Sequence, residues 1–258
     1  MKGLLRGLKK TSLARIATYF SYAHYRVFLS VLTVTSLMIF MHTAILIFML
    51  PPPFSTGPFL APIIALTSFF YVFVIVYLIS VFTSELSTGG ALLFLSFPLS
   101  RVEYVFSWIL NSVVAPSLLY LLSIAIPVAV IDPTLVLNIS GVEITLAVLE
   151  MTAVGTVIFL LSLITKNRKT ALSAGILLYL VVPYLGLIAF SYFKYSLKID
   201  LSNTPVFWVY EALYPYKAGL FTYGSVSWSY NLAFPTAILI ALILAATLFY
   251  SKYRLEVV

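Results

Sequence analysis

Long runs of apolar residues, separated by short polar connections, dominate this chain. Each run is close to the ~20 residues that cross the hydrocarbon core of a bilayer as an α-helix. A helix is the one open-chain element that satisfies its own backbone hydrogen bonds in lipid. The pattern therefore predicts an all-α polytopic membrane protein, with residues 1–258 as a single transmembrane domain. The six predicted spans are Val27–Leu50, Pro58–Phe82, Tyr104–Ile131, Ile144–Ile164, Ala171–Phe193 and Leu232–Tyr250.

Lys and Arg residues gather on one side of these spans. With six spans, twelve of the 15 basic residues fall on one side. They are Lys2, Arg6, Lys9, Lys10, Arg15, Arg26, Arg101, Lys166, Arg168, Lys169, Lys252 and Arg254. The other three, Lys194, Lys198 and Lys217, lie in one long connection before the last span. Because cytoplasmic loops carry the excess of Lys and Arg, we expect a multi-pass protein of the cell membrane with both termini in the cytoplasm.

Composition agrees with a membrane protein and excludes several classes of site. Hydrophobic residues make up 62% of the chain and charged residues 9%, against about 25% charged in soluble domains. The mean hydropathy is +1.09. The absence of cysteine excludes disulfides and thiolate chemistry. We expect no metal site, because the two histidines cannot form one by themselves, and no nucleic-acid partner, because the basic residues lie at membrane edges.

The N-terminal arm, residues 1–26, has the pattern of an amphipathic helix. Leu4, Leu5, Leu8, Ile16 and Phe20 recur at near-helical spacing among basic residues. Such a helix lies in the membrane interface. Two interpretations fit it: a plain topological anchor, and a lever that joins a cytoplasmic partner to the first span.

The connection between the second and third spans contains an apolar run that is too short to cross a bilayer. Gly89 and Gly90 let the chain turn, Ala91–Phe97 then forms about two helical turns across the membrane edge, and Pro98 ends them. The apolar surface of this crosswise helix consists of Leu92, Leu93, Leu95 and Phe97. One interpretation is an ordinary loop with an apolar patch among lipid headgroups. The other is a peg for a cytoplasmic partner.

Two acidic residues flank the crosswise helix. Ser100 and Glu103 have the spacing of a capping box, in which the hydroxyl and the carboxylate bind the unpaired amides at a helix start. Glu85 closes the second span. The segment 85–103 is therefore predicted to run as helix, glycine turn, short crosswise helix, proline and capped helix.

The long external connection, residues 194–231, is rich in aromatic residues, with Trp208 and Tyr214 among them. Pro205 and Pro215 are expected to interrupt any helix there. The segment is expected to form short helices that dip into the outer leaflet without crossing it, either as an interfacial aromatic belt or as an outer gate over a substrate path.

Polar residues inside the spans are few. Glu150 is the one acid well inside a span, where a carboxylate is costly and usually faces the bundle interior or water. It either meets a cationic or hydroxylated substrate, or is protonated or hydrogen-bonded to a hydroxyl such as Thr152. His42, in the outer half of span one, is a possible partner. Pro183 and Gly186 predict a kink in span five.

The segment around the crosswise helix resembles the motif of ABC type-2 permeases. That motif runs from Glu through a few residues to Gly-Thr, an apolar stretch, and Leu-Pro-hydrophobic-Ser-Arg. The matching residues are Glu85, Gly89, Gly90, Pro98, Leu99, Ser100 and Arg101. Gly90 stands where the family often has Thr. The resemblance covers essentially the whole chain, since the amphipathic arm, the spans, the aromatic loop with Tyr214-Pro215 and the basic tail 250–258 also look like the family.

The resemblance implies a permease that pairs with a second copy or a related chain and docks on two separate ATPase subunits. The crosswise helix would sit in a cleft of the ATPase and transmit its closure. The residues implied in this coupling are Glu85, Gly89, Gly90, Leu92, Leu93, Phe97, Pro98, Arg101 and Glu103. ATP and Mg²⁺ would bind the partner subunit, since this chain has no G-x-x-x-x-G-K-[ST] stretch.

A substrate path is implied between spans one and five of the paired copies, under re-entrant helices before the last span. The residues assigned to this path or its gate are His42, Glu150, Pro183, Trp208, Tyr214 and Pro215. The expected function is ATP-driven export of a lipid, a peptide or an amphiphile in contact with membrane lipid.

Two alternatives remain open at this point. An intramembrane enzyme needs a catalytic set, and Glu143 with Glu150 is the only close acid pair in or at the edge of a span. A secondary transporter usually shows internal repeats and broken helices with ion ligands, and the two halves of this chain show no convincing repeat.

Overall fold

The structure is a computed structural model of the chain, and it describes residues 25–49, 57–95, 100–131, 141–223 and 232–253. Helices form almost all of this part, and it contains no strand. The predicted all-α class is therefore confirmed. Of the predicted amphipathic arm, residues 1–24 lie outside the described part, as do Phe97 and Pro98, and its last two residues, Tyr25 and Arg26, begin α3.

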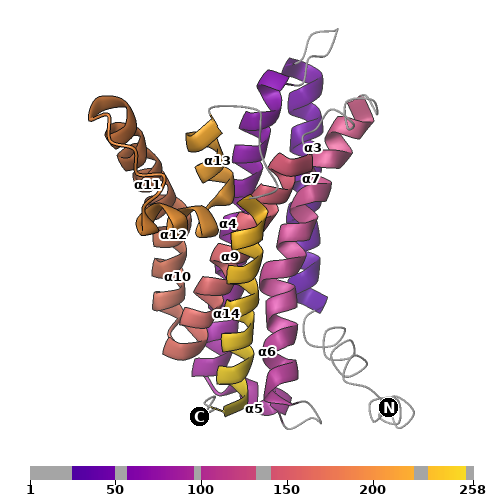
Figure 1. Cartoon of the computed structure of the whole chain (residues 1–258). Helices are drawn as coiled ribbons and strands as arrows, with labels where there is room; N and C mark the ends of the chain where they lie inside the picture. The colour runs from indigo at the N-terminus through magenta and orange to yellow at the C-terminus, as the bar shows by residue number, and fades with distance from the viewer. Residues whose placement is uncertain (1–24, 50–56, 96–99, 132–140, 224–231, 254–258) are drawn as a thin grey trace.

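The helices stand side by side as an elongated bundle (Figure 1). Their bounds are α3 Tyr25–Met49, α4 Gly57–Ser87, α5 Gly90–Leu95, α6 Arg101–Ile109, α7 Ala115–Ile131, α9 Gly141–Thr165, α10 Arg168–Ile176, α11 Val182–Ser191, α12 Pro205–Leu213, α13 Pro215–Tyr223 and α14 Ala233–Tyr253. Three π-helical segments continue neighbouring α-helices: η1 Leu110–Val114, η2 Leu177–Val181 and η3 Tyr192–Ser196.

Five continuous helices of the described part are long and apolar enough to cross a membrane. They are Thr67–Ser87, Arg101–Val130, Ile144–Thr165, Arg168–Ser196 and Ala233–Tyr253. They correspond to predicted spans two to six. The first predicted span falls on α3, whose apolar described stretch, Leu29–Ile45, is shorter. A sixth crossing at α3 stays a prediction.

The helix ends differ from the predicted spans by a few residues. The second span was predicted to end at Phe82, but α4 continues to Ser87 and carries Glu85 inside its last turn. The third begins at Arg101 rather than Tyr104 because the capping box starts the helix there. Polar residues therefore extend these helices beyond their apolar runs.

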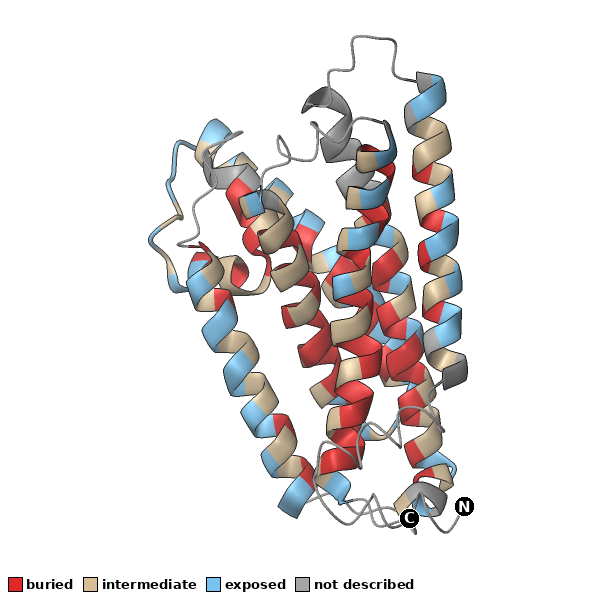
Figure 2. Cartoon of the chain, turned by 90° about the vertical axis from the view of Figure 1, so that its right-hand side faces the viewer, coloured by how far each residue is buried: buried red, intermediate tan, exposed pale blue. Residues whose placement is uncertain are grey.

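Buried side chains gather in the middle of the bundle, and the outer helices carry mostly exposed and half-buried residues (Figure 2). A cluster of rings holds the centre near the α5 end. Phe82 of α4 stacks on Phe159 of α9 with 4.5 Å between ring centroids, and Trp108 of α6 packs on Phe82 at 5.5 Å. Aromatic contacts of this kind add about 0.5–1.5 kcal/mol to the apolar burial, so these rings hold α4 against both α6 and α9.

The two ends of the bundle carry different polar residues. The start of α10 and the end of α14 lie at the same end as α5 (Figure 1). Arg101, Arg168, Lys169 and Lys252 belong to the helix ends there. The connection from η3 to α12 lies at the far end of the α10–α11 helix.

The aromatic connection forms two short helices, α12 and α13, as predicted. The expected role of the prolines was wrong: Pro205 and Pro215 do not interrupt these helices but begin them. Proline suits the first helical position because its missing N–H has no partner there in any case. The Thr204 hydroxyl also accepts the N–H of Phe207 and caps α12.

Candidate functional site

Helix α5 connects α4 and α6 at one end of the bundle (Figure 1). Gly89 turns the chain between α4 and α5 with φ of 75°, a left-handed conformation that side chains other than glycine rarely adopt. The N–H of Leu92 then donates to the carbonyl of Gly89 at 3.0 Å. The predicted glycine turn is confirmed at Gly89. The described helix ends at Leu95, and residues 96–99 lie outside the described part.

Glu85 joins the end of α4 to α6. Its carboxylate oxygen Oε2 accepts the Tyr104 hydroxyl at 2.6 Å and the Trp108 indole N–H at 3.0 Å. Gly90 fits against the same side chain, since a Cβ there would lie 3.1 Å from Glu85 Cγ. Two charge-assisted hydrogen bonds thus fix the helices on both sides of α5.

The predicted capping box is confirmed at the start of α6. The Ser100 hydroxyl accepts the N–H of Glu103 at 3.2 Å, and a carboxylate oxygen of Glu103 accepts the N–H of Ser100 at 2.8 Å. Glu103 is buried, whereas Arg101, the first residue of α6, is exposed. The chain therefore leaves the α5 connection in a fixed direction.

The surface of α5 is divided between core and exterior. Ala91 is fully buried, and Leu95 packs against the core. Leu92 is 50% exposed. The side chains of Leu93 and Phe97 lie outside what the structure describes. Leu92 is thus the exposed residue of the predicted apolar contact surface whose side chain the structure describes.

A second polar site lies between α9 and α13. Glu150 of α9 forms an ion pair with the Lys217 ammonium, and its Oε2 accepts the Lys217 backbone N–H at 3.2 Å. The Glu150 side chain is 6% exposed and that of Lys217 19%. Glu150 follows Gly141, the first residue of α9, by nine positions, or about 14 Å along the helix axis. Helix α13 therefore reaches the middle of α9.

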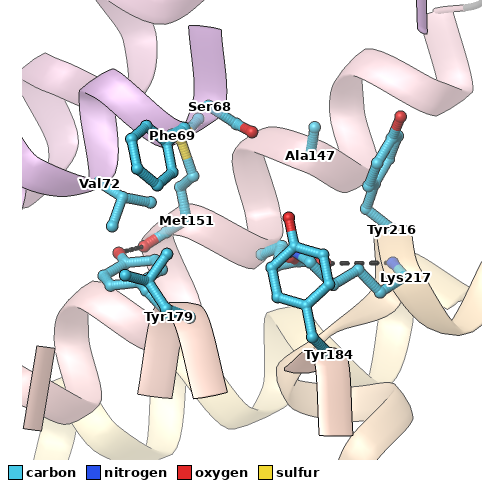
Figure 3. A pocket seen from close by; sticks show the side chains of 11 residues that line it. Ser68, Phe69, Val72, Ala147, Met151, Tyr179, Tyr184, Tyr216 and Lys217 are labelled. Atoms are coloured by element: carbon cyan, nitrogen blue, oxygen red, sulfur yellow. Dashed lines mark hydrogen bonds and ion pairs between the residues drawn. The ribbon is translucent and has the colours of Figure 1, made fainter. Parts of the chain in front are cut away.

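A pocket surrounds this ion pair (Figure 3). Its walls come from α4, α9, the α10–α11 helix and α13, and combine aromatic, aliphatic and charged side chains. The lining residues are Ser68, Phe69, Val72, Ala147, Glu150, Met151, Tyr179, Leu180, Tyr184, Tyr216 and Lys217. The Lys217 Nζ lies 5.8 Å from the ring centroid of Tyr184. Tyr179 donates to the Met151 carbonyl at 2.6 Å, which fixes one wall.

Two tyrosines attach α12 and α13 to the irregular part of span five. Val182 donates its N–H to the carbonyl of Leu177, an i to i−5 bond. In this register the next donor is Pro183, which has no N–H. The Leu178 carbonyl instead accepts a hydrogen bond from the Tyr214 hydroxyl, at 2.7 Å. Tyr210 donates to the carbonyl of Pro183 at 2.8 Å.

Pro183 was predicted to produce a kink in span five. The structure has a π-helical segment, η2, directly before it. The assigned path residues Pro183, Tyr214 and Pro215 are therefore brought together with Glu150 around α13.

Gly186 makes room for Tyr210. An added Cβ would lie 2.4 Å from Tyr210 Cε2, and the ring is held by its hydroxyl bond and by Phe190, at 5.0 Å between centroids. We expect Gly186→Ala to lower the free energy of unfolding by about 1–3 kcal/mol, measured as thermal unfolding in detergent. In the background of Tyr210→Leu the same change should have little effect. Equal losses in both backgrounds would contradict this packing.

The structure separates the other two assigned path residues from this site. His42 binds elsewhere, in a buried network between α3, α4 and α7: its Nδ1 lies 3.1 Å from the Ser123 carbonyl and its Nε2 3.0 Å from the Thr67 hydroxyl. It therefore does not contact Glu150, whose partner is Lys217. Trp208 is 55% exposed on α12.

Asn111 of η1 is an unexplained polar residue. It is 1% exposed, and within the described residues neither Oδ1 nor Nδ2 has a hydrogen-bond partner. An unpaired buried amide costs about 1–3 kcal/mol.

We expect Asn111→Leu to raise the stability of the detergent-solubilised chain by about 1 kcal/mol, which is about 2–4 °C in the unfolding midpoint of a chain of this size. Ser112→Ala serves as the neighbouring control, because the Ser112 hydroxyl does have a partner, the Trp108 carbonyl at 2.6 Å. A lower midpoint for Asn111→Leu would show that the amide binds a group of its own.

Sequence reasoning missed the residues that complete both sites. Tyr104 and Trp108 were counted as span residues, although a lone Glu at a span end calls for donors on a neighbouring helix. Lys217 was counted only as a basic loop residue. Its position two residues after Pro215, in an aromatic segment, was the available signal, since a lone acid inside a span needs a cation.

Neither the comparisons with known proteins nor a search for metal ligands identifies the chemistry of these two sites. A comparison with protein-family models finds no match, and neither does one with curated proteins. Among the described residues, no three His, Asp or Glu side chains lie close enough together to hold a metal ion.

Proposed function

We propose that this chain is the membrane-spanning permease subunit of an ABC transporter. Two such subunits form the substrate path, and two separate ATPase subunits supply ATP, Mg²⁺ and hydrolysis. The cargo leaves the cell and is a lipid, a peptide or another amphiphile. The chain lies in the cell membrane with both termini in the cytoplasm and binds no cofactor itself.

The observation that carries this proposal is the way α5 is mounted. A short helix with an exposed leucine connects α4 and α6 at one end of the bundle, and Glu85 fixes these two helices through Tyr104 and Trp108. The capping box fixes the exit of the connection. A push on α5 is therefore transmitted to α4 and α6 together, which is the property that a coupling helix requires.

The charge distribution supports the proposed orientation. Arg101, Arg168 and Lys169 begin helices at the α5 end, and Lys252 lies in the last turn of α14 there. By the positive-inside rule this end faces the cytoplasm, where ATPase subunits have access to α5.

The position of α13 supports re-entrant helices before the last span. Its Lys217 contacts Glu150 near the middle of α9, and the Tyr214 hydroxyl contacts Leu178 in the middle of span five. Short helices that reach the middle of the neighbouring spans but do not cross the whole bundle fit an outer gate. Irregular backbone at membrane depth is tolerated where protein buries it, and the π-helical carbonyl bound by Tyr214 is such a case.

An affinity purification tests this proposal. Tagged chain, extracted from its native membrane in mild detergent, should recover a separate soluble ATPase in equal amount, and the complex should hydrolyse ATP. Recovery of the chain without any ATP-hydrolysing protein, under conditions where the chain remains folded, would contradict the proposal.

A further inference from the structure

The floor of the α9–α13 pocket has the chemistry of an ammonium site. A buried carboxylate, Glu150, and the ring of Tyr184 lie near one cation, the Nζ of Lys217. Carboxylates bind ammonium groups through charge-assisted hydrogen bonds, and aromatic faces attract ammonium groups by a cation–π interaction. In this structure the ammonium group in the site is that of Lys217, a residue of the chain itself.

The two partners of this ion pair differ in their freedom to move. Glu150 projects from the middle of a long helix, and its side chain is 6% exposed. Lys217 reaches it from the short helix α13 on a flexible four-carbon stem, and its side chain is 19% exposed. Lys217 can therefore withdraw toward solvent, whereas Glu150 stays in place.

The pocket lining includes two exposed rings. Phe69 of α4 is 43% exposed and Tyr184 of α11 is 52% exposed, while Val72, Met151 and Leu180 line the interior. The pocket itself is small, about 30 Å³, which is little more than the room for one water molecule. A hydrocarbon chain can therefore lie only outside it, against the exposed rings of Phe69 and Tyr184.

We propose that this pocket binds an amphiphile with a positively charged amine headgroup, which replaces the Lys217 ammonium on Glu150. This deepens the export function proposed above by naming the class of cargo. When the ligand is bound, Lys217 leaves Glu150, and the side-chain contact that holds α13 against α9 is lost.

Binding of dodecylammonium to the full chain in neutral dodecyl maltoside micelles tests this site, by equilibrium dialysis and without ATP. We expect Lys217→Met to bind dodecylammonium about tenfold more tightly than the unmodified chain, because the competing cation is gone; a tenfold change corresponds to about 1.4 kcal/mol. Lys198→Met, at an exposed lysine outside the pocket, should leave the affinity unchanged.

Two further variants complete the test. Lys217→Gln keeps a hydrogen-bond donor near Glu150, and should bind more tightly than the unmodified chain even if Lys217→Met does not fold. Glu150→Gln with Lys217→Met carries neither charge and should bind dodecylammonium no better than dodecyl sulfate. Equal dodecylammonium affinity in the unmodified chain, Lys217→Gln and the neutral double variant would overturn the proposal.

Reconstitution in nanodiscs distinguishes two sources of the amine. If phosphatidylethanolamine in the disc competes with dodecylammonium, the ligand is a membrane lipid; if it does not, the ligand is a free amphiphile. Because these assays need no partner, failure of amine binding leaves the permease function standing, and absence of an ATPase leaves the amine site standing.

Discussion

Lys217→Met is expected to destabilise the detergent-solubilised chain by about 3–5 kcal/mol, the usual effect of removing one member of a buried ion pair. The physical reason is the position of Glu150, which lies about 14 Å along the axis of α9 from the start of that helix. Without the Lys217 ammonium, its carboxylate would keep only the backbone N–H of residue 217 as a donor. At about 2–4 °C per kcal/mol for a chain of this size, the unfolding midpoint should fall by about 10 °C.

The double variant and the reverse single variant separate this effect from general damage to α13. Glu150→Gln with Lys217→Met removes both charges and should recover most of the stability, because neutral replacement of a buried pair is often without cost. Glu150→Gln alone should cost less than Lys217→Met, since Lys217 can turn its ammonium to solvent. A double variant as unstable as Lys217→Met would contradict the ion-pair account.

Leu92→Asp is expected to abolish ATP-driven transport while leaving the membrane fold intact. Leu92 is 50% exposed at the end of the bundle that carries α5, so a carboxylate there meets water in the isolated chain. In a complex the same carboxylate would have to be buried in the ATPase cleft, where an unpaired charge costs several kcal/mol. At 1.4 kcal/mol per factor of ten, affinity for the ATPase should fall at least tenfold.

Leu197→Asp provides the matched control. Leu197 is 45% exposed and lies between η3 and α12, in the external connection of the proposed topology. It should retain ATPase binding and transport. The free energy of unfolding of both variants should lie within about 1 kcal/mol of that of the unmodified chain. Normal ATPase coupling in Leu92→Asp would contradict the role of α5.

Local features of the fold could be predicted because they depend on neighbouring residues. The spacing of Ser100 and Glu103 sufficed for the capping box, since both hydrogen bonds form within four residues. Gly89 sufficed for the turn before α5, because few other residues adopt its φ of 75°. Apolar length likewise identified the five long helices.

Contacts between distant segments were not predictable from a single sequence. Glu85 and Trp108 are 23 residues apart, and Glu150 and Lys217 are 67 apart. Glu150 was recognised as needing a partner, but the sequence offered several, and no partner was sought for Glu85. Helix packing chose among them, and it also placed His42 with Thr67 and Ser123 rather than with Glu150.

The prolines show a further limit. Pro205 and Pro215 interrupt a helix if they lie inside it and begin a helix if they lie at its first residue. Only the position of Thr204 as a cap separates the two for α12. The π-helical segment before Pro183 was not foreseen, because its free carbonyl binds the hydroxyl of Tyr214, a distant residue that lies between α12 and α13.

Site-specific cross-linking from α5 tests the central claim most directly. The chain has no cysteine, so Leu92→Cys gives a single reactive thiol, and Leu197→Cys an equally exposed control. With a short thiol-directed photo-cross-linker in native membranes, Leu92→Cys should join the chain to a separate ATPase, and Leu197→Cys should not. A Leu92→Cys product that contains only lipid, or an ATPase product of equal yield from Leu197→Cys, would contradict the proposal that α5 is the coupling helix.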